Sequence, residues 1–338
     1  MYIVLKDNTL PCDIKKLTDL IEAKNLGTIV IEDLGKVKVG VLGNKKSISK
    51  DEIESMEFVE KIVDITKPYK FASRDFKVED TIIDVNGVKI GGDNFVLMAG
   101  PCSVENEEMI FEIAKEVKRF GGQFLRGGAF KPRTSPYDFQ GLGEEGLKYM
   151  RAAADKYDLQ VVTEVMDSKD IELIAKYSDV MQVGARNMQN FSLLKELGSC
   201  GKPVLLKRGM SATIRDLLMA AEYIIAFGNR EVILCERGIR TFETMTRNTV
   251  DINGIALIKE KSHLPIIIDA SHGTGRRSLV VPVTLASIIA GADGAMVEVH
   301  SNPNCAISDG EQSLNFEEFE ELCKKLKKVL VLRKELKA

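Results

Sequence analysis

Apolar runs of strand length recur along most of the chain, and amphipathic stretches of helical length separate them. From residue 95 onward this alternation is regular to the end. Because the runs are almost continuously apolar, they indicate parallel strands that helices cover. The expected strands span 95–100, 123–126, 160–164, 180–184, 203–207, 231–236, 265–269 and 295–299. The expected helices span 105–120, 144–157, 169–177, 190–197, 212–227, 249–261, 282–290 and 316–336.

Eight strand–helix units within about 250 residues predict an α/β fold, a closed (β/α)8 TIM barrel, rather than an open doubly wound sheet. The first strand is not followed by a Gly-x-Gly-x-x-Gly motif, which weakens the dinucleotide-binding alternative. Just before the first unit, residues 81–90 place apolar residues on both sides of Asn86-Gly87, the pattern of a β-hairpin. We expect this hairpin to close the bottom of the barrel.

Residues 1–66 follow a different order of elements. They predict strands at 2–5, 28–32, 36–42 and 59–65, a helix at 13–26 and a second helix that begins at Ser49. Ser49 with Glu52 forms a capping-box sequence. The order βαββαβ is that of a small ferredoxin-like domain. We therefore expect a ferredoxin-like domain at 1–66, a charged linker at 67–78 and the catalytic barrel at 79–338.

Composition narrows the class of partner. The chain has 338 residues and a net charge of −3, which argues against general binding to nucleic acid or to an anionic membrane. No segment approaches the roughly 18 uninterrupted apolar residues of a membrane span, and residues 1–10 lack the pattern of a signal peptide. We therefore expect a cytoplasmic protein. The six cysteines have no Cys-x-x-Cys spacing and predict no disulfide framework.

Active sites of such barrels lie at the carboxyl ends of the strands, where this chain places ionisable side chains after nearly every strand. Barrel closure makes the seventh, eighth and first strands neighbours, which brings His272, Glu298 and Cys102 to one side of the mouth. Asp309, in the loop after the last strand, can fold over the same point. This mixture of thiolate, imidazole and carboxylates suits one borderline divalent ion such as Mn2+, Fe2+ or Zn2+. Each residue alone has an ordinary structural explanation, but the convergence of all four favours a metal site.

Cationic side chains follow the second, fourth, fifth and sixth strands, and one more lies in the loop after the seventh. Arginine forks bind phosphate or carboxylate bidentately, so several fixed cations in a barrel mouth indicate polyanionic substrates. Two phosphates and a carboxylate would account for them. The cations are Arg126, Lys131, Arg133, Arg186, Lys207, Arg237 and Arg276.

These residues lie in motifs that resemble the 3-deoxy-D-arabino-heptulosonate-7-phosphate (DAHP) synthase family, which opens the shikimate pathway of aromatic amino acid biosynthesis. The resemblance covers 93 to about 320. It lies closest to the subclass that is similar to 3-deoxy-octulosonate-8-phosphate synthase. The motifs are MAGPCSVE (98–105), KPRTSPY (131–137), GARNMQN (184–190), LLKRG (205–209), CERGIR (235–240), DASHGTG (269–275) and SDGEQSL (308–314).

The resemblance implies a divalent-metal-dependent condensation of phosphoenolpyruvate with erythrose 4-phosphate that releases phosphate. The rival is the octulosonate enzyme, which uses arabinose 5-phosphate. The two differ at residues 131–135, where the octulosonate enzymes carry an alanine-asparagine-arginine-serine turn. Arg133 and Thr134 favour the heptulosonate reaction.

The resemblance also assigns residues to roles. Lys131, Cys102 and His272 are the expected catalytic residues, with Lys131 as candidate proton donor. Phosphoenolpyruvate is expected at Arg126, Lys131, Arg186, Lys207 and Arg237. Erythrose 4-phosphate is expected at Pro132, Arg133, Thr134, Ser135 and Arg276, and the metal at Cys102, His272, Glu298 and Asp309.

For residues 1–66 the resemblance suggests feedback inhibition by tyrosine or phenylalanine, in an enzyme that is usually a homotetramer. A plain oligomerisation module is the alternative for this domain. A non-enzymatic amino-acid sensor on an inactive barrel predicts at least one broken metal ligand, and the sequence breaks none. A fused chorismate mutase needs a helical domain, for which 1–66 has the wrong pattern.

Overall fold

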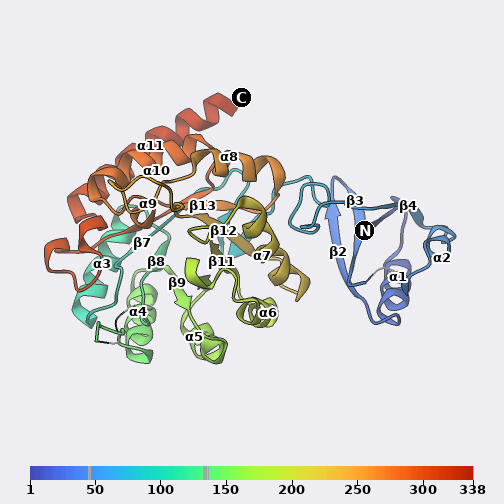
Figure 1. Cartoon of the computed structure of the whole chain (residues 1–338), viewed down its shortest axis with the longest axis horizontal. Helices are drawn as coiled ribbons and strands as arrows, with labels where there is room; N and C mark the ends of the chain where they lie inside the picture. The colour runs from blue at the N-terminus through green and yellow to red at the C-terminus, as the bar shows by residue number, and fades with distance from the viewer. Residues whose placement is uncertain (45–46, 132–134, 136, 338) are drawn as a thin grey trace. The chain divides into compact units, whose positions relative to one another are not determined.

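The eight predicted parallel strands close into a barrel in this computed structural model, which describes residues 1–44, 47–131, 135 and 137–337 (Figure 1). The order around the barrel is β10-β11-β12-β13-β14-β7-β8-β9. Every strand therefore pairs with its neighbour in sequence, and β14 pairs with β7 to close the ring. The strands are β7 (Val96–Gly100), β8 (Phe124–Arg126), β9 (Gln160–Val165), β10 (Val180–Val183), β11 (Val204–Lys207), β12 (Val232–Glu236), β13 (Ile266–Asp269) and β14 (Gly294–Glu298).

Helices lie around the outside of these strands, as the apolar runs predicted (Figure 1). Local sequence fixes where several of them begin. Asn106 accepts a hydrogen bond from the Met109 amide at the start of α3, and Thr213 with Asp216 forms a capping box on α7. The helices are α3 (Glu107–Arg119), α4 (Glu144–Lys156), α5 (Ile171–Tyr177), α6 (Phe191–Ser199), α7 (Ile214–Ala226), α8 (Ile252–Lys261), α10 (Arg277–Ile289) and α11 (Phe316–Lys337).

Two features after β13 differ from the prediction. A short helix, α9 (Ala270–Thr274), was not predicted at all. The next helix, α10, begins at Arg277 rather than at Pro282, which lies inside the helix. A proline at the first helical position is the common arrangement, and it favours a start at Pro282 when only the sequence is considered. Val280 is fully buried, and the earlier start lets this apolar residue pack against the core as part of the helix.

The β-hairpin before the barrel is confirmed as β5 (Ile83–Val85) and β6 (Val88–Ile90). Its turn residues Asn86 and Gly87 have φ values of 50° and 90°, the left-handed conformation that this turn requires. Hairpin side chains share one apolar cluster with barrel residues such as Met98, Phe124 and Met296.

The side-chain Nδ2 of Asn86 donates hydrogen bonds to Gln160 Oε1 at 2.7 Å and to Asp179 Oδ1 at 3.1 Å. These two residues stand at the amino-terminal ends of β9 and β10. The hairpin therefore covers the amino-terminal end of the barrel, as predicted.

The first part of the chain forms a four-stranded antiparallel sheet of order β2-β3-β1-β4. Its apolar core includes Ile3, Leu17, Ile21 and Ile53, from the sheet and from both helices. This is the predicted ferredoxin-like arrangement. Its elements are β1 (Tyr2–Leu5), α1 (Pro11–Glu22), β2 (Gly27–Asp33), β3 (Lys36–Leu42), α2 (Lys50–Glu54) and β4 (Val59–Val63).

Contacts between residues divide the chain into two compact units. One comprises Met1–Asp80 with Lys261–His263, and the other comprises Thr81–Glu260 with Leu264–Ala338. Among the described residues, no helix combines the length and the apolar character that crossing a bilayer requires.

Candidate active site and metal centre

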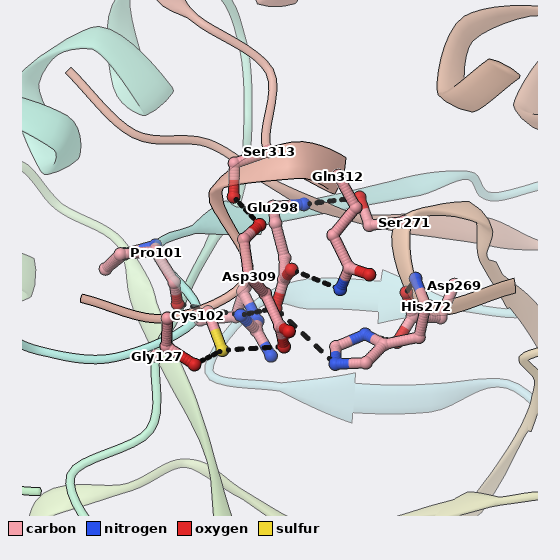
Figure 2. Close-up of polar contacts among 12 residues, drawn as sticks. Pro101, Cys102, Gly127, Asp269, Ser271, His272, Glu298, Asp309, Gln312 and Ser313 are labelled. Atoms are coloured by element: carbon pink, nitrogen blue, oxygen red, sulfur yellow. Dashed lines mark hydrogen bonds and ion pairs between the residues drawn. The ribbon is translucent and has the colours of Figure 1, made fainter. Parts of the chain in front are cut away.

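Three side chains from distant parts of the chain converge where β14 and β7 end. Glu298 closes β14, Cys102 follows β7, and Asp309 lies in the loop after β14. One ligand atom from each lies within 4.8 Å of the other two, and the Cys102 thiol donates to Asp309 Oδ2 at 3.2 Å. Figure 2 shows these side chains pointing toward one another. The eighth and first barrel strands, β14 and β7, are neighbours as predicted, and Cys102, Glu298 and Asp309 lie together at their ends.

His272, the fourth expected metal ligand, lies beside this group rather than inside it. Its Nε2 is 3.5 Å from Glu298 Oε1, and its ring faces Glu298 in Figure 2. Its Nδ1 is 2.8 Å from Asp269 Oδ2, while its backbone amide donates to Asp269 Oδ1 at 3.0 Å. Asp269 therefore caps the helical turn that carries His272 and places a carboxylate oxygen beside the imidazole.

The protonation of this cluster fits a cation. Burial, followed by the charge of Glu298, raises the pKa of the Cys102 thiol to about 11. Burial alone would also raise the pKa of Glu298, but His272 and Arg126 outweigh it and hold that pKa below its usual range. Burial opposes ionisation of Asp309 as well, yet His272 and Arg247 keep its pKa lowered. The buried carboxylate of Glu298 and the partly exposed carboxylate of Asp309 thus face a thiol that a divalent ion would ionise, and this donor set suits a borderline metal.

Two predicted cations lie against the cluster. Arg126 is buried and donates from Nη1 to Glu298 Oε1 at 2.9 Å and to the Pro101 carbonyl at 2.7 Å. Lys131 donates from Nζ to the Cys102 carbonyl oxygen at 2.9 Å and to its sulfur at 3.0 Å. Both cations therefore partly compensate the negative charge of Glu298 and Asp309.

A cavity of about 130 Å³ opens beside the cluster at the strand ends. We call it the strand-end cavity. Its lining includes Lys131, Glu164, Arg186, Lys207 and Arg237, together with the candidate ligands His272 and Asp309. Four of the five residues expected to bind phosphoenolpyruvate therefore share one cavity, whereas Arg126 is buried next to Glu298.

Arg237 carries the clearest sign of an anionic ligand. Its Nη1 is buried and has no hydrogen-bond partner within the part of the chain that the structure describes. Burial lowers the pKa of this guanidinium, an effect that a bound anion would reverse. Buried donors in native proteins are almost always paired, so this atom favours a phosphate or carboxylate partner.

The end of β12, just before Arg237, is held by a separate hydrogen-bond network. None of its side chains is named in the lining of the strand-end cavity. Arg208, which follows β11, donates to Glu236 Oε2 at 2.8 Å and to Asp251 Oδ2 at 2.8 Å. Glu236 Oε1 in turn accepts the Gly238 amide at 2.6 Å. The strand pattern marks Glu236 as an ionisable strand end, and the structure places it in this buried ion pair, one residue before Arg237.

A larger cavity of about 1030 Å³ adjoins the first among the loops, and we call it the loop cavity. Arg247 and Asp309 line both cavities. Arg276 lines the loop cavity and not the strand-end cavity, so the structure separates it from Lys131.

The remaining residues expected to bind the aldose phosphate are only partly described. Ser135 accepts a hydrogen bond from the Tyr137 amide at 3.2 Å and is named in the lining of neither cavity. Pro132, Arg133 and Thr134 lie outside the described residues.

Sequence reasoning missed three residues of the site. Lys207 forms a close ion pair with Asp269, so Asp269 links the strand-end cavity to His272. The sequence marks Asp269 only as a strand end. Arg247 and Gln312 were not predicted, because both lie several residues beyond a strand, Arg247 in a loop and Gln312 at the end of a short 3-10 helix, Gly310–Gln312. For Gln312 a signal existed, since it stands three residues after Asp309 in the motif SDGEQSL.

Comparison with known proteins gives two family matches. Residues 75–335 match the DAHP synthetase I family, and residues 1–67 match the DAHP synthase ferredoxin-like domain. A "phospho-2-dehydro-3-deoxyheptonate aldolase" of Thermotoga maritima is 51% identical over 97% of both chains. A "2-dehydro-3-deoxyphosphooctonate aldolase" of Fusobacterium nucleatum is 31% identical over 72% of this chain and 95% of its own.

Solved structures agree with these matches. The crystal structure of the Thermotoga maritima DAHP synthase superposes with a TM-score of 0.77, and it covers 97% of this chain at 51% identity. A truncated form of the Thermotoga maritima enzyme covers 77% of this chain with a TM-score of 0.73 at 52% identity. That second match covers 96% of the truncated chain. The truncated Thermotoga maritima enzyme is therefore itself a folded protein.

Proposed function

The chain belongs to the DAHP synthetase I family, and on this premise we propose that it condenses phosphoenolpyruvate with D-erythrose 4-phosphate. The products are 3-deoxy-D-arabino-heptulosonate 7-phosphate and inorganic phosphate, the first step of the shikimate pathway. The observation that carries the proposal is the contact between Lys131 and Cys102. It joins a cavity lined by cations to a cluster of candidate metal ligands.

The reaction balances with one water. The methylene carbon of phosphoenolpyruvate forms a carbon–carbon bond with the aldehyde carbon of erythrose 4-phosphate, whose oxygen takes a proton and becomes a hydroxyl. Water adds to the carbon that carries the phosphate ester and loses a proton. The carbon–oxygen bond to phosphate then breaks, and phosphate leaves with the bonding electron pair. The hydroxyl on that carbon gives its remaining proton to the departing phosphate and becomes the ketone carbonyl of the product.

The residues of the strand-end cavity take the binding roles. Arg186, Lys207 and Arg237 hold the phosphate and carboxylate of phosphoenolpyruvate, and Arg126 supports this half of the site through its bond to Glu298. Such charge-assisted bonds fix the direction from which the methylene carbon faces the aldehyde, and they stabilise the departing phosphate. Lys131 Nζ holds the proton that the new hydroxyl receives.

A single divalent ion completes the proposal. Cys102, His272, Glu298 and Asp309 would hold Mn2+, Fe2+, Zn2+ or a similar ion, which supplies Lewis acidity toward the aldehyde oxygen or toward a water. Cys102, Glu298 and Asp309 already converge, and His272 faces Glu298 at 3.5 Å. The aldose phosphate is proposed to contact residues 132–135 and Arg276.

One assay tests the reaction, the second substrate and the metal together. Phosphate release from phosphoenolpyruvate is measured with erythrose 4-phosphate or with arabinose 5-phosphate, each with and without a chelator. We expect faster turnover of erythrose 4-phosphate and loss of activity after chelation. Faster turnover of arabinose 5-phosphate would instead support the octulosonate reaction named in the more distant relatives. Full activity of metal-free protein would overturn the metal assignment.

Residues 1–66 are proposed to form the regulatory domain, joined through 67–78 to a catalytic barrel at 79–338. The match of residues 1–67 to the DAHP synthase ferredoxin-like domain supports this division. The effector would be tyrosine or phenylalanine, and the assembly a homotetramer. Analytical ultracentrifugation with and without each amino acid tests the assembly.

A further inference from the structure

A buried amide connects a loop arginine to one of the candidate metal ligands. Gln312 Nε2 donates to Glu298 Oε2 at 2.7 Å, and Gln312 Oε1 accepts from Arg247 Nη1 at 2.9 Å. Gln312 is 3% exposed and Glu298 is 1% exposed, whereas the Arg247 side chain is 41% exposed. Figure 2 shows the Gln312 side chain directed at Glu298. The contact therefore runs from the lining of both cavities into the buried cluster.

The chemistry of the two partners allows one orientation of the amide. An arginine only donates hydrogen bonds, and an ionised carboxylate only accepts them. Glu298 is ionised because Arg126 pairs with its other oxygen at 2.9 Å. The amide oxygen of Gln312 must then face Arg247 and its NH2 group must face Glu298. With Oε1 held by Arg126 and Oε2 held by Gln312, the Glu298 carboxylate cannot rotate without losing a buried hydrogen bond.

The backbone anchors both ends of this connection near other candidate ligands. The Leu314 amide donates to the Glu298 carbonyl oxygen at 2.8 Å, which ties the segment of Gln312 to the end of β14. At the other end, the Arg247 amide donates to the Thr274 carbonyl oxygen at 3.0 Å, on the helix α9 that carries His272. The Asn248 side chain adds a bond of 3.0 Å to the His272 carbonyl oxygen.

Arg247 also contacts Asp309 directly, from Nη1 to Oδ1 at 3.5 Å. This distance is longer than its bond to Gln312, so Gln312 is the main partner of the guanidinium. The loop around Arg247 is thus connected to His272 through the backbone, to Asp309 through a weak ion pair and to Glu298 through Gln312.

We propose that Gln312 is a positioning residue that, together with Arg247, fixes the orientation of Glu298 for metal binding. This inference rests on the proposed metal site. Gln312 lines the loop cavity, but both ends of its side-chain amide are already bonded, one to Glu298 and the other to Arg247. It acts by holding one oxygen of Glu298, and Arg247 acts by holding the Gln312 amide in the orientation that donates.

The test measures binding of Co2+ alone to the full-length metal-free protein, by competition with a chromophoric chelator. The absorption of the cobalt ion and of the thiolate–cobalt bond reports the geometry around the metal without any turnover. In Gln312→Met both hydrogen bonds are lost at nearly constant volume. Loss of an outer hydrogen-bond partner typically weakens metal binding by about 10–100-fold, and we expect a loss in this range with altered cobalt absorption.

A second variant separates positioning from packing. Gln312→Glu keeps an acceptor for Arg247 but cannot donate to Glu298 and places a like charge beside it. We expect Co2+ affinity to fall at least as far as in Gln312→Met. Far-ultraviolet circular dichroism and the thermal midpoint of each metal-free variant establish that it is folded. If Gln312→Met does not fold, Arg247→Met tests the same connection at a partly exposed side chain.

The two positions should not act independently. Arg247→Met is expected to weaken Co2+ binding in the wild-type background and to have at least a roughly threefold smaller effect in the Gln312→Met background. Arg240→Met serves as the matched control, since Arg240 is an exposed arginine of the same loop outside this connection. Its Co2+ affinity and cobalt absorption should equal those of the wild type.

The outcomes distinguish the two claims. If the wild-type protein itself does not bind Co2+, the proposed metal site fails. If the wild type binds Co2+ while folded Gln312→Met and Gln312→Glu variants bind it equally well with unchanged absorption, the positioning role fails and the metal site stands. Equal effects of Arg247→Met in both backgrounds would also overturn the proposed connection.

Discussion

The ammonium group of Lys131 lies 3.0 Å from the Cys102 sulfur, at the edge of the strand-end cavity. A second hydrogen bond of 2.9 Å to the Cys102 carbonyl oxygen fixes Nζ at this point. The same lysine therefore contacts a candidate metal ligand and lines the cavity in which we place phosphoenolpyruvate. A proton held here lies between the two halves of the proposed reaction.

Lys131 is expected to contribute through its proton as well as its charge. Lys131→Met should lower kcat by about 10²–10⁴-fold, the usual contribution of a general acid or base. Lys131→Arg keeps the positive charge, but a guanidinium in a protein does not give up its proton, so activity should stay low. Steady-state rates of phosphate release measure both. Recovery of activity in Lys131→Arg would show that the charge alone is needed.

Cys102→Ser should abolish metal-dependent activity. The change preserves the shape of the side chain and removes the soft sulfur ligand, so metal binding should weaken by more than the roughly 10–100-fold that loss of an outer partner costs. Metal content after dialysis and the rate of phosphate release measure the effect. Cys305→Ser is the control, because Cys305 is an exposed cysteine of the loop that carries Asp309. An active, metal-replete Cys102→Ser protein would contradict the ligand assignment.

His263 should make stability depend on pH. Burial, with smaller contributions from Lys77 and Arg74, lowers the pKa of His263 from 6.5 to about 4. Between these values the unfolded chain binds a proton that the folded chain excludes. Stability is therefore complete above pH 6.5 and falls as the pH drops toward 4, by up to about 3 kcal/mol.

Urea unfolding from about pH 7.5 to about pH 4.5 measures this effect against His263→Gln. His263 donates from Nε2 to the Phe71 carbonyl oxygen at 2.7 Å, and the glutamine amide can replace that donor without titrating. We expect the variant to lose less stability over this range than the wild type. Parallel pH profiles would contradict the assignment to His263.

Removal of the amino-terminal domain should separate catalysis from inhibition. A chain that begins at Phe71 is expected to keep its catalytic rate and to lose inhibition by tyrosine or phenylalanine, because the proposed effector domain is gone. The solved structure of a truncated relative supports testing such a chain. Inhibition curves for both amino acids, on the full and the shortened chain, measure the effect. Sustained inhibition of the shortened chain would place the effector site in the barrel.

Periodicity predicted the fold because each barrel strand is apolar on both faces and each helix on one. Residues at the ends of the strands, such as Glu298, and just after them, such as Cys102, could therefore be assigned to one end of the barrel from the sequence alone. The helix α9 escaped this reasoning, because five residues that include a glycine have no recognisable period. Its local signals were Asp269, as a cap three residues before His272, and Gly275, whose left-handed backbone ends the helix.

The supporting residues of the site were harder to find than the charged ones. Gln312 and Arg247 are 65 residues apart, and only their tertiary contact gives either one a role. The sequence also could not predict that Arg276 and Lys131 line different cavities, because each is simply a cation in a loop motif. The path of each loop decides which cavity its cation lines. Strand ends are fixed by the barrel, whereas the course of a long loop depends on what it packs against.

The β5–β6 hairpin closes the amino-terminal end of the barrel. Its apolar side chains fill the amino-terminal end together with Met98 and Phe124, so the described residues leave no second exit there for a small molecule. In the proposed reaction, both substrates therefore enter and both products leave past the loops at the opposite end. A substitution that narrows the opening between these loops would therefore slow substrate binding and product release together. Product release or substrate binding, rather than bond formation, would then limit the rate of turnover.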